Sequence, residues 1–217
     1  MRVGIVVFPG SNCDRDVYHT LQYTGHDPTY IWHEDHIPKY VDSIILPGGF
    51  SFADRLRAGV IASHCPIISD IQDMAKEHKP ILGICNGFQI LAEAGLLPGV
   101  LLPNGKQGFM CKWTNIITHQ NKTPFTRTLD RGTRIPIPVA NGEGRYYVDD
   151  PKKLERNGQI VFKYEYNING STDNIAGVCN EDGNVVGLMP HPERGAEPDI
   201  NPYDHRPAMA IFEGMVA

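Results

Sequence analysis

The stretch Pro80-Ile-Leu-Gly-Ile-Cys-Asn-Gly87 decides the fold, because an apolar run passes directly into a helical pattern. Residues 80–84 predict a buried strand, and residues 86–94 predict a helix. Cys85 stands between them, with a glycine two residues to either side. This is the strand–turn–helix pattern of a nucleophile elbow, in which glycine permits the tight turn and the close approach of neighbouring backbone.

The predicted elbow gives Cys85 the setting of a reactive thiol. It places the sulfur at the N-terminal end of a helix, where the helix dipole favours thiolate over thiol. It also directs the free amide of Asn86 toward the place where negative charge forms on a substrate carbonyl. A structural cysteine in a glycine-rich turn is the alternative, and the pentapeptide alone does not exclude it.

Length and composition favour one domain over residues 1–217. With 217 residues and 41% hydrophobic content, the chain can bury a full core. A net charge of −5 argues against a nucleic-acid surface. No apolar run approaches the roughly 20 residues that span a membrane, and residues 1–8 are too short for a signal peptide. Five cysteines without a CxxC pair indicate a reduced, cytoplasmic protein and give no zinc-site spacing.

Alternating patterns in the first half predict an α/β fold, an open and mostly parallel sheet with helices on both faces. The expected strands are residues 3–8, 28–33, 43–46 and 80–84. Asn12 or Asp14 is expected to cap the first helix, and Pro66 to start another. Ligands bind beyond the carboxyl ends of such strands, where both Gly48-Gly49 and Cys85 stand.

The second half predicts an antiparallel β excursion with no strong helix between its strands. The expected strands are residues 110–118, 134–139, 159–166, 175–179 and 185–189. Asp182-Gly183 is a hairpin signal between the last two of them. A short helix from about Pro207 is expected to end the chain.

His191 is the expected base among nine histidines, because of the run Met189-Pro-His-Pro-Glu-Arg194. A proline favours an extended conformation in the residue before it, and an extended chain directs residues i and i+2 to the same side. The carboxylate of Glu193 would then hold one imidazole nitrogen while the other faces Cys85. A charged surface turn is the alternative.

Other clusters give weaker signals. The histidines of Trp32-His-Glu-Asp-His36 are three apart, whereas the zinc-protease helix needs them four apart, so a solvated loop is expected. Residues 54–57 are expected to form a helix face rather than an anion clamp. Packing is the expected role of the other four cysteines, which are Cys13, Cys65, Cys111 and Cys179.

Three motifs together resemble class I (triad) glutamine amidotransferases: Pro47-Gly-Gly49, Gly83-Ile-Cys-Asn-Gly-Phe-Gln89 and His191-Pro-Glu193. This family has a flavodoxin-like fold. With Pro9-Gly-Ser-Asn-Cys-Asp14 and Leu188–Arg194, the chain further resembles the glutaminase subunits of phosphoribosylformylglycinamidine synthase. The likeness covers nearly the whole chain.

The resemblance implies a glutaminase with Cys85 as nucleophile, His191 as proton donor and Glu193 as the residue that orients His191. Backbone amides of Gly49 and Asn86 would hold the oxyanion, and Gln89 would contact the substrate L-glutamine. Ammonia would pass to a large synthase subunit that converts formylglycinamide ribonucleotide to its amidine, with a small accessory subunit bridging the two. ATP and magnesium would belong to that partner, so no cofactor or metal is expected here.

The sequence leaves two other interpretations open. One is a related amidotransferase that serves the vitamin B6, histidine or guanylate branch, or a stand-alone γ-glutamyl hydrolase. The other is a flavodoxin-like regulatory module, which the complete triad disfavours. Ala53, Arg55 and Asn141 depart from the family pattern, which often has glycine, an aromatic residue and histidine there. The rim of the pocket and the contact with the large subunit are therefore expected to differ in detail from the family pattern.

Overall fold

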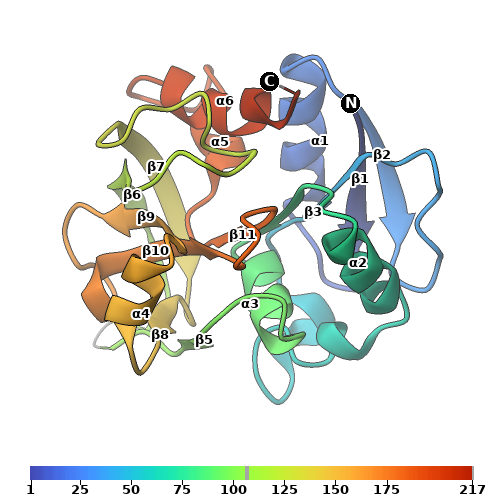
Figure 1. Ribbon diagram of the computed structural model, residues 1–217, viewed down its shortest axis with the longest axis horizontal. Coiled ribbons are helices and arrows are strands. Elements are labelled where there is room, and N and C mark those ends of the chain that lie inside the picture. Colours follow the sequence, from blue (N-terminus) through green and yellow to red (C-terminus); the bar gives the residue numbers. More distant parts are fainter. Residues whose placement is uncertain (106–107, 217) are drawn as a thin grey trace.

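One nine-stranded sheet runs through the computed structural model, which describes residues 1–105 and 108–216 (Figure 1). The five strands from β2 to β11 pair in parallel, and the four pairings from β11 to β7 are antiparallel, which confirms the expected fold class. In sheet order the strands are β2 (Asp27–Trp32), β1 (Arg2–Val7), β3 (Ser43–Leu46), β4 (Ile81–Ile84), β11 (Val185–Leu188), β10 (Ile175–Cys179), β9 (Ile160–Tyr164), β6 (Met110–Thr118) and β7 (Arg134–Asn141).

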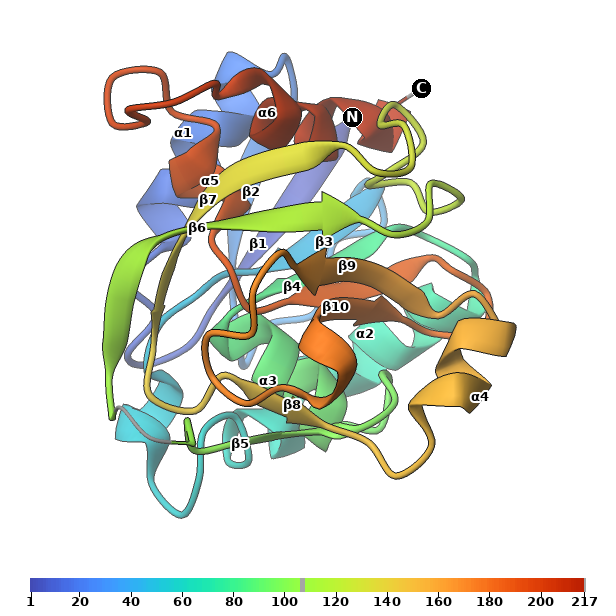
Figure 2. The same cartoon turned by 90° about the vertical axis from the view of Figure 1, so that its left-hand side faces the viewer.

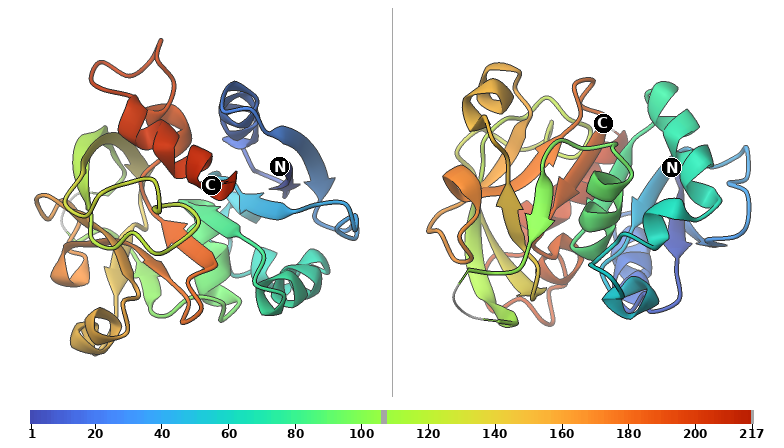
Figure 3. Two further views of the ribbon diagram at one scale, coloured as in Figure 1. Left: turned by 45° about the horizontal axis from the view of Figure 1, so that its top comes forward. Right: turned by 90° about the horizontal axis from the view of Figure 1, so that it is seen from below.

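Helices lie on both faces of the parallel half (Figures 1 and 3). One face carries α1 (Asp14–Tyr23), α5 (Pro192–Gly195) and α6 (Arg206–Glu213), and the other carries α2 (Ile67–Lys76) and α3 (Asn86–Glu93). Between these layers β3, β4 and β11 are buried at every residue. Strands covered on both faces are almost continuously apolar, and Ser43 is the one polar residue in these three.

The antiparallel half curves away from this layered part, and its last strand, β7, is an edge (Figure 2). Pro136 and Pro138 lie in β7, where a missing amide donor is tolerated. A small second sheet pairs β5 (Val100–Leu102) with β8 (Arg145–Tyr147). Because the large sheet joins both halves of the chain, it supports the expectation of one domain over residues 1–217, which stays a prediction.

Two local expectations for the first half of the chain are wrong. Cys13, rather than Asn12 or Asp14, holds the N-cap position of α1 and makes no side-chain cap bond. Its amide instead donates to the carbonyl of Gly48 at 3.1 Å, because the loops after β1 and β3 pair with each other. Residues 54–57 form no helix face, since Asp54 has φ 51° and Leu56 has φ 70°.

A helix also interrupts the second half of the chain, where no strong one was expected. It is α4 (Pro151–Arg156), beside the antiparallel strands. The Asp150 side chain accepts from the amide of Lys153 at 3.0 Å, and Pro151 opens the helix. Both are helix-start signals that were present in the sequence.

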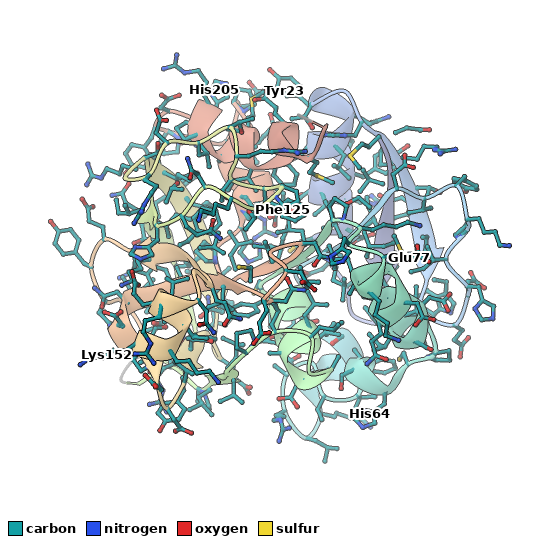
Figure 4. The ribbon with its side chains drawn as sticks, in the orientation of Figure 1. Tyr23, His64, Glu77, Phe125, Lys152 and His205 are labelled. Atoms are coloured by element: carbon teal, nitrogen blue, oxygen red, sulfur yellow. The ribbon has the colours of Figure 1, made fainter. Side chains whose placement is uncertain are left out.

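Most charged side chains lie at the periphery of the molecule, and Glu193 is a buried exception. Lys152 and Glu77 are exposed at its margins, whereas Phe125 is fully buried (Figure 4). Across the described ranges, 1–105 and 108–216, no helix combines the length and the apolar character needed to cross a membrane.

The contact between α3 and β3 generates a stability prediction. A Cβ added at Gly87 would overlap the carbonyl of Leu46, which is backbone and cannot rotate away. We expect Gly87→Ala to lower the free energy of unfolding by about 1–3 kcal/mol, the usual effect of overpacking. Gly142→Ala is the control, because its Cβ would meet only the Phe109 ring at 3.8 Å. Equal urea midpoints for the two variants would contradict this prediction.

Candidate active site

The candidate site lies beyond the carboxyl ends of four interior strands of the sheet, β1, β3, β4 and β11. These four strands are neighbours and run parallel, so their carboxyl ends lie together. The pairing of β4 with β11 is in register at Ile84 and Leu188. Cys85 therefore follows one strand directly, and His191 follows its neighbour by three residues.

Cys85 occupies the predicted elbow between β4 and α3. Its φ of 49° and ψ of −105° lie in a region that a residue with a Cβ rarely adopts. The backbone is held there by a hydrogen bond from the Cys85 amide to the Leu188 carbonyl, 2.8 Å long. A Cβ at Gly83 would lie 2.7 Å from the carbonyl oxygen of Gly87, so both flanking glycines are needed for the turn.

His191 and Glu193 form the predicted pair, with His191 Nδ1 2.7 Å from Glu193 Oε1. The two residues are 2% and 1% exposed. The expected geometry of the pair is wrong, because Glu193 lies in the helical turn of α5 rather than in an extended chain. Pro192 occupies the first position of that turn, which suits proline's fixed φ, and His191 is its N-cap residue.

The buried pair alters the ionisation of the imidazole. Burial by itself lowers the pKa of His191, but the negative charges of Glu193 and Cys85 outweigh it, and the pKa stands well above its usual value. Two hydrogen bonds hold the backbone of the pair. The His191 amide donates to the Pro138 carbonyl at 2.9 Å, and the Thr20 hydroxyl donates to the Glu193 carbonyl at 3.0 Å.

Cys85 and His191 line one small cavity of about 190 Å³. The other residues of its wall are Asn12, Cys13, Gly49, Phe50, Phe109, Ala140 and Arg194. A thiol and an imidazole that share a cavity, with a carboxylate on the far imidazole nitrogen, form the nucleophile–base–orienter arrangement of a cysteine hydrolase.

The two expected oxyanion donors both lie beside Cys85 in the chain or in space. Gly49 lines the cavity and pairs with Ser11 in an isolated antiparallel bridge. The two hydrogen bonds of this bridge are donated by the amides of Asn12 and Phe50, so they do not use the amide of Gly49. Asn86 opens α3, where the first amides have no partner within the helix. Their roles in binding an oxyanion stay predictions.

Gln89 is buried one turn after the nucleophile. Its side-chain amide donates to the Glu143 carbonyl at 2.8 Å, and its oxygen accepts from the Asn86 side chain at 3.0 Å. Both of its polar atoms are therefore bound to the protein, and it does not line the cavity with Cys85. Its contact with glutamine stays a prediction.

Packing was the expected role of Cys13, and this interpretation missed its place in the cavity wall. Cys13 is 3% exposed, and its Sγ lies 3.2 Å from Arg194 Nη2. The sequence held a signal for this position, because Pro9-Gly-Ser-Asn-Cys13 follows the first strand and so lies at the ligand-binding edge.

The two histidines of the 32–36 segment lie in different surroundings, and the absence of a metal there stays a prediction. His33 is buried and stacks on Phe8 with ring centroids 5.7 Å apart. His36 is exposed and pairs with Asp70. Of the three departures from the family pattern, Ala53 has a positive φ of 57°, which explains the glycine common there.

Comparison with known proteins identifies the class. The whole chain, residues 1–217, matches the family described as the CobB/CobQ-like glutamine amidotransferase domain. This chain therefore belongs to that family of glutamine amidotransferases.

Similar proteins narrow the comparison. The chain is 47% identical to "Phosphoribosylformylglycinamidine synthase subunit PurQ" of Chlorobaculum parvum, over 100% of this chain and 90% of that protein. It is 46% identical to the protein of the same name from Methanothermobacter thermautotrophicus, over 100% and 98%. A solved chain in "Structure of PurLQS from Thermotoga maritima" superposes with a TM-score of 0.92 at 45% identity, covering 99% of this chain and 97% of that one.

The raised pKa of His191 generates a prediction. Glu193→Gln removes the negative charge that raises the pKa of His191, and the effect of burial, which lowers it, remains. We therefore expect the pKa of His191 to fall in this variant. The imidazole titration would be followed by NMR in the folded protein. Because the pKa of His191 is raised in the folded wild type, protonation of His191 stabilises the fold. This stabilisation is present below about pH 6.5, the ordinary pKa of histidine, and is lost as the pH rises through the raised pKa.

Glu155→Gln is the matched control, since Glu155 pairs with the more exposed His119. This variant should leave the titration of His191 unchanged. A pKa for His191 that is the same in Glu193→Gln and in the wild type would contradict the assignment of the pair.

Proposed function

We propose that this chain hydrolyses the side-chain amide of L-glutamine and supplies ammonia for the conversion of formylglycinamide ribonucleotide to its amidine in purine synthesis. The observation that carries the proposal is a single cavity lined by both the strained Cys85 and His191, whose Nδ1 lies 2.7 Å from the buried Glu193 carboxylate. Relatives about half identical over the full chain favour this acceptor over the vitamin B6, histidine and guanylate branches.

In the first step His191 takes the proton of the Cys85 thiol, and the sulfur bonds to the amide carbon of glutamine. The carbon–nitrogen bond then breaks, and ammonia departs with a proton from His191. Water next adds to the glutamyl thioester, giving its proton to His191. The carbon–sulfur bond breaks, and glutamate leaves with the thiol restored.

Glu193 keeps His191 oriented through both steps, because its carboxylate accepts from Nδ1 and leaves Nε2 for the reacting groups. The amides of Gly49 and Asn86 would stabilise the oxyanion, and removal of one such donor typically lowers the rate about 100- to 1,000-fold. Gln89 would contact the glutamine once its present hydrogen bonds rearrange.

The proposed partners are a large synthase subunit and a small accessory subunit. The name PurLQS, given to the solved Thermotoga maritima relative, supports a multisubunit assembly. ATP and magnesium would bind the large subunit, and no cofactor is proposed for this chain. All five cysteines are free, and Cys111 is exposed. Free thiols are typical of the reducing cytoplasm, where we place the reaction.

The first test is removal of the nucleophile. Cys85→Ala should lower glutamate release by at least about 10⁴-fold, the scale on which loss of a nucleophile acts in triad enzymes. Cys65→Ser is the matched control, because Cys65 is half-buried outside the cavity, and it should retain activity. Persistent glutamate release by Cys85→Ala would reassign the nucleophile.

The second test concerns the partner. The isolated chain should hydrolyse glutamine poorly, because partner-driven closure commonly completes sites of this kind. The rate would be measured alone, and then with the large and small subunits, ATP and formylglycinamide ribonucleotide. Equal rates in the two assays would show that the site is complete without a partner.

A further inference from the structure

A second thiol stands beside the catalytic pair, and the proposed reaction gives it no task. One ligand atom each from Cys13, His191 and Glu193 lie within 4.8 Å of one another. The three residues are 3%, 2% and 1% exposed. Cys13 comes from the loop before α1, whereas His191 is the N-cap residue of α5 and Glu193 lies within α5, so tertiary packing brings sulfur, nitrogen and oxygen together.

The same cluster contains buried polar atoms that lack partners. Within the described part of the chain, His191 Nε2 and Glu193 Oε2 are buried and form no hydrogen bond. A buried polar atom left without a partner is unfavourable by about 1–3 kcal/mol. Catalysis accounts for a free Nε2, which exchanges protons with the reacting groups. It gives no task to Oε2, whose lone pairs are free to bind a ligand.

We propose that Cys13, His191 and Glu193 form a binding site for Zn²⁺. Thiolate, imidazole and carboxylate are the three side-chain ligands that zinc takes in proteins. One thiolate and one carboxylate also balance the charge of the ion while the imidazole stays neutral. Three protein ligands leave the fourth tetrahedral position to a water molecule.

The surroundings of the three ligands fit this assignment. Arg194 Nη2 lies 3.2 Å from Cys13 Sγ, and Arg194 Nε lies 3.0 Å from Asp16 Oδ2, so the cation beside the thiol has a counter-ion of its own. The Thr20 hydroxyl fixes the Glu193 backbone. Outer contacts of this kind orient metal ligands. Cys13 and His191 both line the cavity, which gives an ion its path of entry.

Bound zinc would inhibit the glutaminase, a consequence that rests on the proposed function. An ion on Glu193 and His191 takes the carboxylate away from its orienting role and the imidazole away from proton transfer. The site itself stands on the geometry alone, so binding and inhibition are tested separately.

The binding experiment uses the full chain with reduced thiols. Zn²⁺ affinity is measured by competition with a chromophoric chelator, and Co²⁺ is added as a spectroscopic probe of thiolate ligation. Wild type and Cys85→Ser should bind one ion. Cys13→Ser and Glu193→Gln should bind it at least about 100-fold more weakly, since even outer contacts of a metal site contribute 10- to 100-fold. Cys111→Ser is the control for an exposed thiol.

Thermal unfolding checks that each variant folds, and Cys13→Ala replaces Cys13→Ser if the hydroxyl is not tolerated. Retained affinity in the Cys13 variant, or lost affinity in Cys85→Ser, would overturn the site in favour of the Cys85–His191 pair. Absence of binding to the wild type at micromolar Zn²⁺ would also overturn it. In the glutaminase assay, Zn²⁺ should slow the wild type more than Cys13→Ser, each relative to its own metal-free rate. A chain without glutaminase activity that still bound zinc through Cys13 would refute only the proposed function.

Discussion

The parallel pairing of β4 with β11 is the constraint on which the site depends. These strands lie far apart in the sequence, and between them the chain builds the whole antiparallel half of the sheet. Their register sets the carboxyl end of one beside that of the other, so the thiol and the imidazole emerge at a single edge. The backbone bond from Cys85 to Leu188 belongs to the same ladder. The placement of Cys85 beside His191 therefore depends on this strand pairing.

Burial of the imidazole and its carboxylate requires support from other elements. An isolated charge loses its hydration in the interior, and an opposite charge with hydrogen bonds must replace it. Here the imidazole of His191 and the carboxylate of Glu193 replace part of each other's hydration. Thr20 of α1 binds the backbone of Glu193, and Pro138 of β7 binds the backbone of His191. The first helix and the edge strand thus contribute to the chemistry without touching the reacting atoms.

Most of the parallel half and the local settings of Cys85 and His191 were predictable, because both depend on local patterns, while their catalytic roles stay proposals. The apolar run before Cys85 fixed the elbow, and the two prolines around His191 marked the base. The cavity role of Cys13 was missed, since it depends on how the loops after two strands pair across the sheet. The helical turn at Glu193 was missed for a similar reason: extended and helical starts are both compatible with His-Pro, and α5 packs against distant elements, α1, α6 and β7.

The side chain of Asn86 has a mechanical consequence. Its oxygen accepts from the Ser51 amide at 3.1 Å, and its nitrogen donates to Gln89. Ser51 lies two residues after Gly49, so the two segments that offer amides to the cavity are cross-linked behind it. A displacement of the surface segment that begins at Phe50 would pull on the first turn of α3 as well. The two segments of the cavity wall are therefore coupled through the Asn86 side chain, and a molecule that binds the segment at Phe50 would also affect the backbone next to Cys85.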